Sequence, residues 1–193
     1  GQKIAEGAAM MTNTEVRCEI MSAVWPVRTN QGLAEVIKSN MDIVGAPDWT
    51  KKEHDFARTI QKKIGAEPLG LLNEVRPLNG PSKQRAPSND CGDISWKVPM
   101  GRIGFPSNIP GVAFHHWTGG AALTTSIAHK GAFVGAKVLA ATVLDLLTVP
   151  ELVERAKATF ADEIAGVEYQ PLIPEGQKPP IDLNREMMEA FRP

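Results

Sequence analysis

The sequence has 193 residues, of which 42% are hydrophobic and 22% charged, and this composition is typical of a globular protein rather than a disordered one. Its 21 basic and 22 acidic residues nearly cancel, so no overall basic charge indicates a nucleic-acid partner. No window approaches the roughly 20 apolar residues of a membrane span, and Cys18 and Cys91 lie outside any metal-binding spacing, which together predict a cytoplasmic protein.

Two elements are predicted before the first proline. Residues 1–11 are in helical period from the start, with no capping residue before them, and a chain that begins inside a helix is expected to be part of a longer one. Residues 14–24 then alternate with period two, which predicts a half-buried strand that ends at Pro26. We therefore expect residues 1–28 to be the end of a domain in which helices pack on a sheet.

Two helices and a long loop follow. Apolar residues recur at helical spacing over 31–44, and the sequence from Thr50 to Glu53 is a T-x-x-E capping box that predicts a second helix start. Residues 65–87 are polar and rich in Pro and Gly. A loop of that length inside a compact domain is expected to be functional or partly mobile.

The last third of the chain is predicted to be helical and then extended. A helix over 126–147 is rich in Gly and Ala, so that another element can approach its backbone closely, and its apolar run is interrupted by Lys137 and Asp145. A second capping box, Thr148 to Glu151, predicts a helix through Ile164. Residues 29–165 are thus expected to form the main domain, followed by a Pro-rich tail, 166–193, with a turn of helix near its end.

Adjacent histidines, His115 and His116, follow a Pro-Gly pair in the stretch that is richest in His, Trp, Gly and Pro. A loop after a short apolar strand, which we predict over 103–105 and 111–114, is a typical place for a metal ligand. The more common alternative is that one ring caps a helix and the other is solvated. Zinc requires three or four protein ligands, and the sequence contains no HExxH, HxH or CxxC motif, so these residues alone predict no complete site.

Four other polar residues are candidates for a site. Asp90 and Asp93 are suited to hold a cation or to orient a metal-bound histidine. Turn formation or helix capping explains them equally well. Arg28 and Asn30, near the expected domain boundary, are suited to bind a substrate carboxylate, although most exposed pairs of this kind are simply solvated.

Several long blocks of the sequence resemble one known family. The blocks SNDCGDISWKVP, PGVAFHHW and SIAHKGAFVGAKVLAATVLDLL are similar, in this order, to the C-terminal portion of the aminobenzoyl-glutamate utilization protein B group, and the similarity extends back through WTKKEHDFAR and LAEVIKSNM. That group belongs to the aminoacylase/carboxypeptidase-type dizinc metallopeptidases. The resemblance implies an α/β fold, in which residues 29–165 are the C-terminal part of the catalytic domain. It also implies that residues 1–28 supply the last helix and strand of an α+β lid domain, through which the protein forms a homodimer.

The resemblance also implies specific roles. His115, four residues after the glycine of the Pro-Gly pair, takes the place of a metal-ligand histidine, whereas His116 departs from the family pattern. Asp90 corresponds to the acidic residue of a glycine-rich segment of the family. The other ligands of the two zinc ions, for which manganese or cobalt are alternatives, and the general base lie upstream of this chain in the family. The chain alone is therefore expected to be inactive and to need a missing N-terminal half of the catalytic domain.

Two functions remain open at this point. The resemblance implies a fragment of a metal-dependent amidohydrolase that cleaves a small-molecule substrate, the amide of an N-acyl or aroyl amino acid such as aminobenzoyl-glutamate. The alternative is a non-catalytic binding or dimerisation module that holds no metal.

Overall fold

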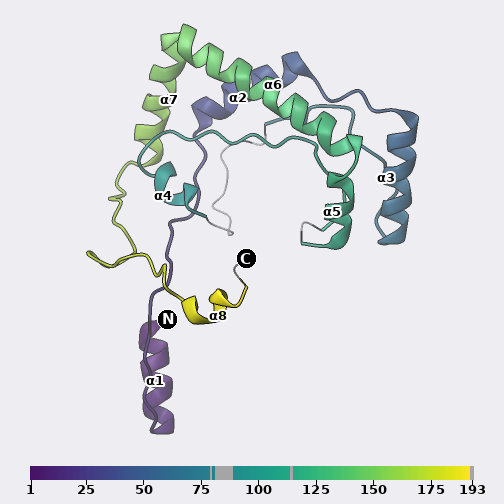
Figure 1. Ribbon diagram of the computed structural model, residues 1–193. Helices are drawn as coiled ribbons and strands as arrows, with labels where there is room; N and C mark the ends of the chain where they lie inside the picture. Colours follow the sequence, from purple (N-terminus) through teal and green to yellow (C-terminus); the bar gives the residue numbers. More distant parts are fainter. Residues whose placement is uncertain (79, 81–88, 114, 192–193) are drawn as a thin grey trace.

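The computed structural model describes residues 1–78, 80, 89–113 and 115–191, and within these residues it contains eight helices and no β-strand. The helices, in chain order, are α1 (Gln2–Thr12), α2 (Gln31–Val44), α3 (Lys51–Lys63), α4 (Cys91–Ser95), α5 (Trp117–Leu123), α6 (Ser126–Thr148), α7 (Pro150–Glu163) and α8 (Arg185–Glu189). Long extended segments connect them (Figure 1).

Three helices form the main layer of the molecule. The longest helix, α6, turns back into α7, and α2 packs against both of them. Figure 1 shows this layer as an arch, with α7 at one end and α3 and α5 at the other. The close approach of α2 to α7 depends on Gly32, because a Cβ atom there would lie 2.8 Å from Thr159 Oγ1 and 3.1 Å from the Cα atom of Ala156.

The hydrophobic core lies between α3, α5 and the start of α6. It contains Trp49, Ala57, Ile60, Leu71, Ile109, Ala122 and Ile127, with Val112 packed against it. Extended chain around Pro106 also packs directly on α6. A Cβ atom at Gly131 would lie only 2.3 Å from the Pro106 carbonyl oxygen, and one at Gly135 would lie 2.7 Å from the Phe105 ring.

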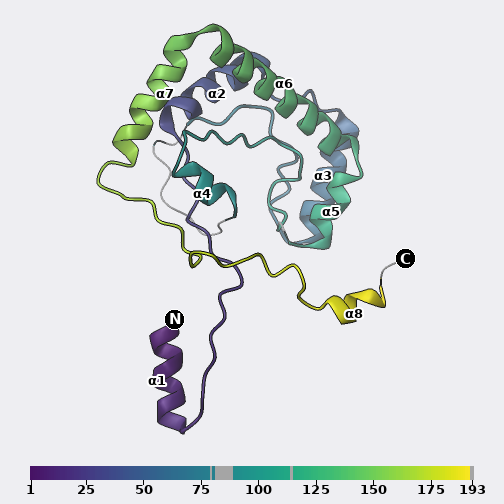
Figure 2. The same cartoon turned by 60° about the vertical axis from the view of Figure 1, so that its left-hand side comes forward.

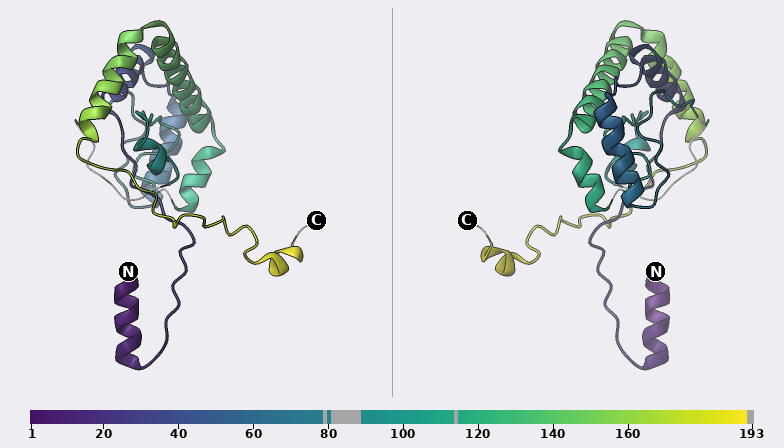
Figure 3. Two further views of the ribbon diagram at one scale, coloured as in Figure 1. Left: turned by 90° about the vertical axis from the view of Figure 1, so that its left-hand side faces the viewer. Right: turned by 90° about the vertical axis from the view of Figure 1, so that its right-hand side faces the viewer.

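The two ends of the chain lie away from this core. Helices α1 and α8 contain no buried residue, and Figures 2 and 3 show both of them projecting from the helical body. Residues 14–22 are exposed as well. The tail touches the body near Trp25, whose indole N–H donates to the Gln170 carbonyl at 2.8 Å.

Most of the predicted helices are confirmed. Helix α2 spans the predicted residues 31–44, Thr50 and Glu53 form both hydrogen bonds of a capping box, and α6 begins at the predicted Ser126. The second predicted capping box is wrong. Thr148 is the last residue of α6, where its hydroxyl donates to the Leu144 carbonyl, and the N-cap of α7 is Val149, which makes no side-chain capping bond.

The predicted α/β fold is contradicted, because the described part of the chain has no strand. Residues 14–24 are extended but form no ladder, and their backbone meets the tail through a hydrogen bond from the Gln177 side chain to the Ile20 carbonyl. The predicted strands at 103–105 and 111–113 are likewise irregular. Period-two spacing shows which side chains share a face, but a strand forms only where a neighbouring backbone pairs with it.

Some predictions fall outside the described residues. These are residue 79 and residues 81–87 of the predicted loop, and residue 114 of the predicted strand. The described remainder of the loop, residues 65–78 and residue 80, contains no helix, as expected. The predicted domain limits stay a prediction.

The exclusion of a membrane span, which was drawn from the sequence, was too strong. By length and composition alone, α6 is apolar enough to cross a membrane, and it is the one helix in the described ranges that meets this criterion. Only 22% of its most apolar 18-residue window is buried.

Candidate functional site

The two histidines lie at the start of α5, and both are exposed. His116 is the residue that caps α5: its Nδ1 lies 2.7 Å from Thr118 Oγ1 and accepts the Thr118 backbone N–H at 3.4 Å. Its ring also lies against Trp117, with centroids 5.6 Å apart. The capping alternative therefore describes His116.

The segment that leads to His115 is anchored by Gln61, a side chain only 1% exposed in the last full turn of α3. Its amide nitrogen donates to the carbonyls of Pro110 at 3.0 Å and Gly70 at 3.1 Å, while its amide oxygen accepts the Gly70 N–H at 2.8 Å. One buried side chain thus satisfies three backbone groups on two loops, and it holds the Pro-Gly bend at a set distance from α3.

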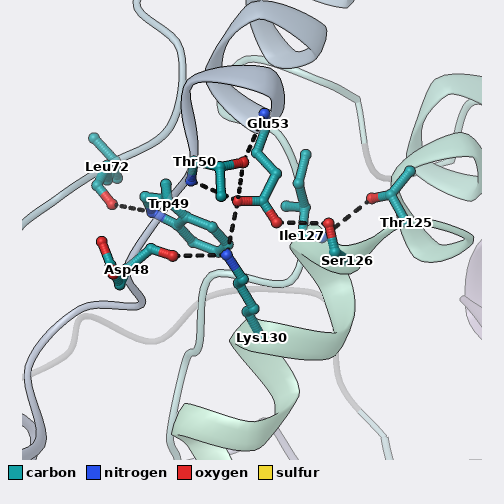
Figure 4. A network of polar contacts seen from close by, with 9 residues as sticks. All are labelled: Asp48, Trp49, Thr50, Glu53, Leu72, Thr125, Ser126, Ile127 and Lys130. Atoms are coloured by element: carbon teal, nitrogen blue, oxygen red, sulfur yellow. Dashed lines mark hydrogen bonds and ion pairs between the residues drawn. The ribbon is translucent and has the colours of Figure 1, made fainter.

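The other side of the histidine segment is anchored by Glu53 (Figure 4). This carboxylate, in the first turn of α3, accepts the Lys130 ammonium at 2.9 Å and the Ser126 hydroxyl at 2.5 Å, both from the start of α6. It also accepts the Thr50 backbone N–H and hydroxyl. Lys130 in turn donates to the Asp48 carbonyl at 2.7 Å. The corner between α5 and α6 is therefore tied to α3.

The network changes the pKa of Glu53. Burial by itself raises the pKa of this carboxyl, but the hydrogen bonds from Lys130, Ser126 and Thr50 outweigh it and lower the pKa from 4.5 to about 2. Glu53 is therefore ionised at neutral pH and serves as a buried acceptor. His115 lies between two fixed points, Pro110 and Ser126, and α3 holds both.

The two aspartates have local roles in this structure. Asp90 is the N-cap of α4, and its carboxylate accepts the Cys91 N–H at 3.2 Å. Asp93, one turn further on, accepts the Tyr169 hydroxyl at 2.9 Å, and this bond raises the pKa of the phenol. The turn and capping alternative thus describes Asp90, while Asp93 attaches the C-terminal segment to α4.

Arg28 and Asn30 lie at the start of α2, but their environments differ. The Arg28 guanidinium stacks 4.7 Å from the Trp96 ring centroid, and its backbone N–H donates to Ser95. Asn30 is 2% exposed: its oxygen accepts the Leu33 N–H, and its nitrogen donates to the Ala156 carbonyl of α7. Asn30 joins two helices in this structure, and its predicted contact with substrate is not tested by it.

The predicted site residues do not gather into one cluster. Among residues 1–78, 80, 89–113 and 115–191, no three His, Cys, Asp or Glu side chains lie close enough together to hold a metal ion. A cavity of about 540 Å³ is a separate, mostly apolar space under α6, lined by residues such as Trp49, Phe105, Ile109 and Val138. None of the predicted site residues lines it.

Sequence reasoning missed the two anchors. Glu53 was recognised only as half of a capping box, and its second function depends on Lys130, 77 residues away. Gln61 follows the buried Ala57 and Ile60 at helical spacing, so a polar residue on an apolar face was the signal that could have identified it.

Comparison with known proteins identifies a relative. No protein-family profile matches the chain, and no solved structure matches it either. The chain is 30% identical to a subunit of the p-aminobenzoyl-glutamate hydrolase of Escherichia coli (strain K12) over 202 residues, which cover 92% of this chain and 42% of that protein. This confirms the resemblance noted from the sequence blocks. The chain is therefore a relative of a p-aminobenzoyl-glutamate hydrolase subunit and spans less than half the length of that subunit.

Proposed function

We propose that the chain is part of a subunit that hydrolyses the amide of an N-acyl or aroyl amino acid, such as aminobenzoyl-glutamate. The observation that carries the proposal is the sequence similarity to a hydrolase subunit over 92% of the chain. More than half of that relative lies outside the match. We therefore assign the remaining catalytic groups to polypeptide beyond these 193 residues, and we propose that the chain is inactive without it.

His115 is the residue that we assign to catalysis through a metal. It is exposed, and the segment that carries it is anchored at Pro110 by Gln61 and at Ser126 by Glu53. A ligand held between two anchors keeps its position when a second polypeptide supplies the other ligands. His116, which uses Nδ1 to cap α5, is the weaker choice.

The residues of this chain do not by themselves fit a zinc site. Zinc takes three or four protein ligands, and the described part of the chain offers no group of three. The proposal is therefore limited to one ligand, His115, for one of two zinc, manganese or cobalt ions in the intact enzyme. Asp90 and Asp93 are weaker candidates for outer partners of that site, because each already has a local bond.

For the substrate carboxylate, Arg28 is the better candidate. Its guanidinium lies over the Trp96 ring, and within the described ranges of the chain it forms no ion pair with a carboxylate. Asn30 is a weaker candidate, because its side chain is buried and bonded within the fold. We also propose a cytoplasmic location, which is supported by Cys18 and Cys91 both being free thiols.

The test compares His115→Ala with His116→Ala in the complete subunit. Metal per subunit is measured by mass spectrometry, and turnover is measured with aminobenzoyl-glutamate. We expect His115→Ala to lose bound metal and more than about 100-fold in turnover, whereas His116→Ala keeps both. The 193-residue chain is expected to bind no metal by itself. Full metal content and full turnover in His115→Ala would show that the ligand assignment is wrong.

A second candidate function is an assembly module that holds no metal and dimerises through its N-terminal region. The exposed apolar side chains of α1 favour it: Ile4, Met10 and Met11 are 77%, 83% and 83% exposed. A complete subunit that sediments as a homodimer but does not hydrolyse any N-acyl amino acid would support this candidate over the first.

A further inference from the structure

The C-terminal tail returns to the point where the N-terminal chain leaves the helical body. Figure 2 shows the chain that follows α7 crossing the extended chain between α1 and α2. Two hydrogen bonds hold this crossing. The Trp25 indole N–H donates to the Gln170 carbonyl at 2.8 Å, and the Gln177 side-chain amide donates to the Ile20 carbonyl at 2.6 Å. We call residues 166–177, which include both contacts, the strap.

The body holds the crossed chain on one side only. The Trp96 indole N–H donates to the Pro26 carbonyl at 2.9 Å, and Asn30, four residues further on, is 2% exposed. Residues 14–22, in contrast, are exposed. Among the described residues, the one hydrogen bond that joins residues 14–22 to chain beyond the N-terminal segment, residues 1–24, is the bond to the strap. The strap therefore supplies the polar attachment that the body does not.

The strap is attached to the body at Tyr169. The Tyr169 hydroxyl donates to the Asp93 carboxylate of α4 at 2.9 Å, and a hydrogen bond to a charged acceptor is stronger than one between neutral groups. The Lys97 ammonium lies 4.3 Å from the centroid of the Tyr169 ring. The Trp25 ring centroid lies 5.6 Å from the same centroid. Tyr169 thus links the strap both to α4 and to the residue at which the N-terminal segment meets the body.

The strap is stiff between its two attachments. Pro171 and Pro174 each lock a backbone torsion. After Pro174 the chain turns: the Gln177 backbone N–H donates to the Pro174 carbonyl at 3.2 Å, and Gly176 has a φ of 78°, which favours glycine. This turn presents the Gln177 side chain to Ile20. A stiff segment that is attached at both ends transmits its position from the body to the N-terminal segment.

We propose that the strap fixes the orientation of the N-terminal segment relative to the helical body, with Tyr169 as the attachment to the body and Gln177 as the attachment to the segment. In the complete subunit, polypeptide joined to α1 turns with this segment, so the strap restricts rotation about residues 22–25. The proposal concerns two parts of this chain and does not depend on the proposed hydrolase function.

The test measures the distance between the N-terminal segment and the body in the complete subunit. Spin labels are attached to Cys18, which is exposed, and to Ala158→Cys on the exposed side of α7, with the other cysteines replaced by serine. Double electron–electron resonance gives the distribution of distances between the labels. We expect one narrow distribution with the strap intact, and a distribution at least about twofold broader when Tyr169→Phe and Gln177→Ala are combined. Gln170→Ala is the matched control, because the Gln170 side chain forms no hydrogen bond in the described part of the chain, and it should keep the narrow distribution.

A second variant separates the restraint from the stability of the fold. A short Gly-Ser insertion after Pro174 keeps every contact residue but makes the strap slack, so it should broaden the distribution as well. Urea unfolding is measured for every variant, and broadening supports the proposal only where the unfolding midpoint matches that of Gln170→Ala. If the combined substitutions prevent folding, the insertion decides. A distribution that stays narrow in the folded variants, or one that is already broad with the strap intact, would overturn the proposal.

Discussion

Replacing Glu53 with Gln tests whether the charge of this buried carboxylate stabilises the fold. Gln has nearly the same shape, and its one carbonyl oxygen can still accept the hydrogen bonds from Thr50, while its amide nitrogen then donates to the Ser126 hydroxyl; it no longer neutralises Lys130. The side chain of Glu53 is 8% exposed and that of Lys130 is 35% exposed. Water can therefore solvate part of the lysine charge but very little of the glutamate charge. The substitution therefore removes mainly the charge of one partner in a half-buried pair.

The expected magnitude follows from the pKa of Glu53. Folding lowers it from 4.5 to about 2, and at about 1.4 kcal/mol per pKa unit this corresponds to about 3 kcal/mol of stability at neutral pH. Because the pKa is lowered in the folded state, this contribution is complete above pH 4.5 and is lost as the pH falls toward 2. Glu53→Gln should therefore reduce the free energy of unfolding by about 2 to 3 kcal/mol at pH 7, and the difference from wild type should shrink below pH 4.5.

Urea unfolding followed by circular dichroism, at several pH values between 2 and 7, measures both effects. Asp55→Asn is the matched control, because Asp55 is also in α3 and also binds a lysine, Lys51, but on the solvent side. The hydrogen bond from Lys51 lowers the pKa of Asp55, and solvent screening keeps its contribution small. Equal losses of stability in the two variants, or a Glu53→Gln difference that does not change with pH, would refute the reasoning.

Three further substitutions test the packing and the anchors. Gln61→Ala should cost about 2 to 3 kcal/mol in urea unfolding, because three buried backbone groups lose their partner, and hydrogen exchange at Gly70 should rise. Gly131→Ala should lower the melting temperature and cost about 1 to 3 kcal/mol, since a Cβ atom there meets the Pro106 carbonyl, whereas Gly120→Ala, which has open space, should not destabilise the protein. Asn30→Ala should cost about 2 kcal/mol by removing the α2 cap and the bond to α7, and unchanged unfolding would contradict that assignment.

The site could be predicted only in its local parts. His115 and His116 were found as a pair, but the cap that His116 forms depends on where α5 begins. Asp90 was explained equally well as a cap, and the structure uses it as one. The anchors Glu53 and Gln61 escaped notice because their partners, Lys130 and Pro110, are distant in sequence. Hydrogen bonds between such residues form only after the chain has folded.

What the sequence determined by itself is the set of helices whose signals are short-range. The limits of α2, the Thr50–Glu53 capping box and the small residues of α6 depend on neighbours three or four positions away, and all of them were predicted correctly. The tertiary structure decided the remainder. Residues 14–24 have strand spacing but, within the described part of the chain, no neighbouring backbone to pair with, and Thr148 ends α6, with its hydroxyl bonded to the preceding turn, instead of capping α7. Local spacing sets which side chains share a face, and only packing decides what that face meets.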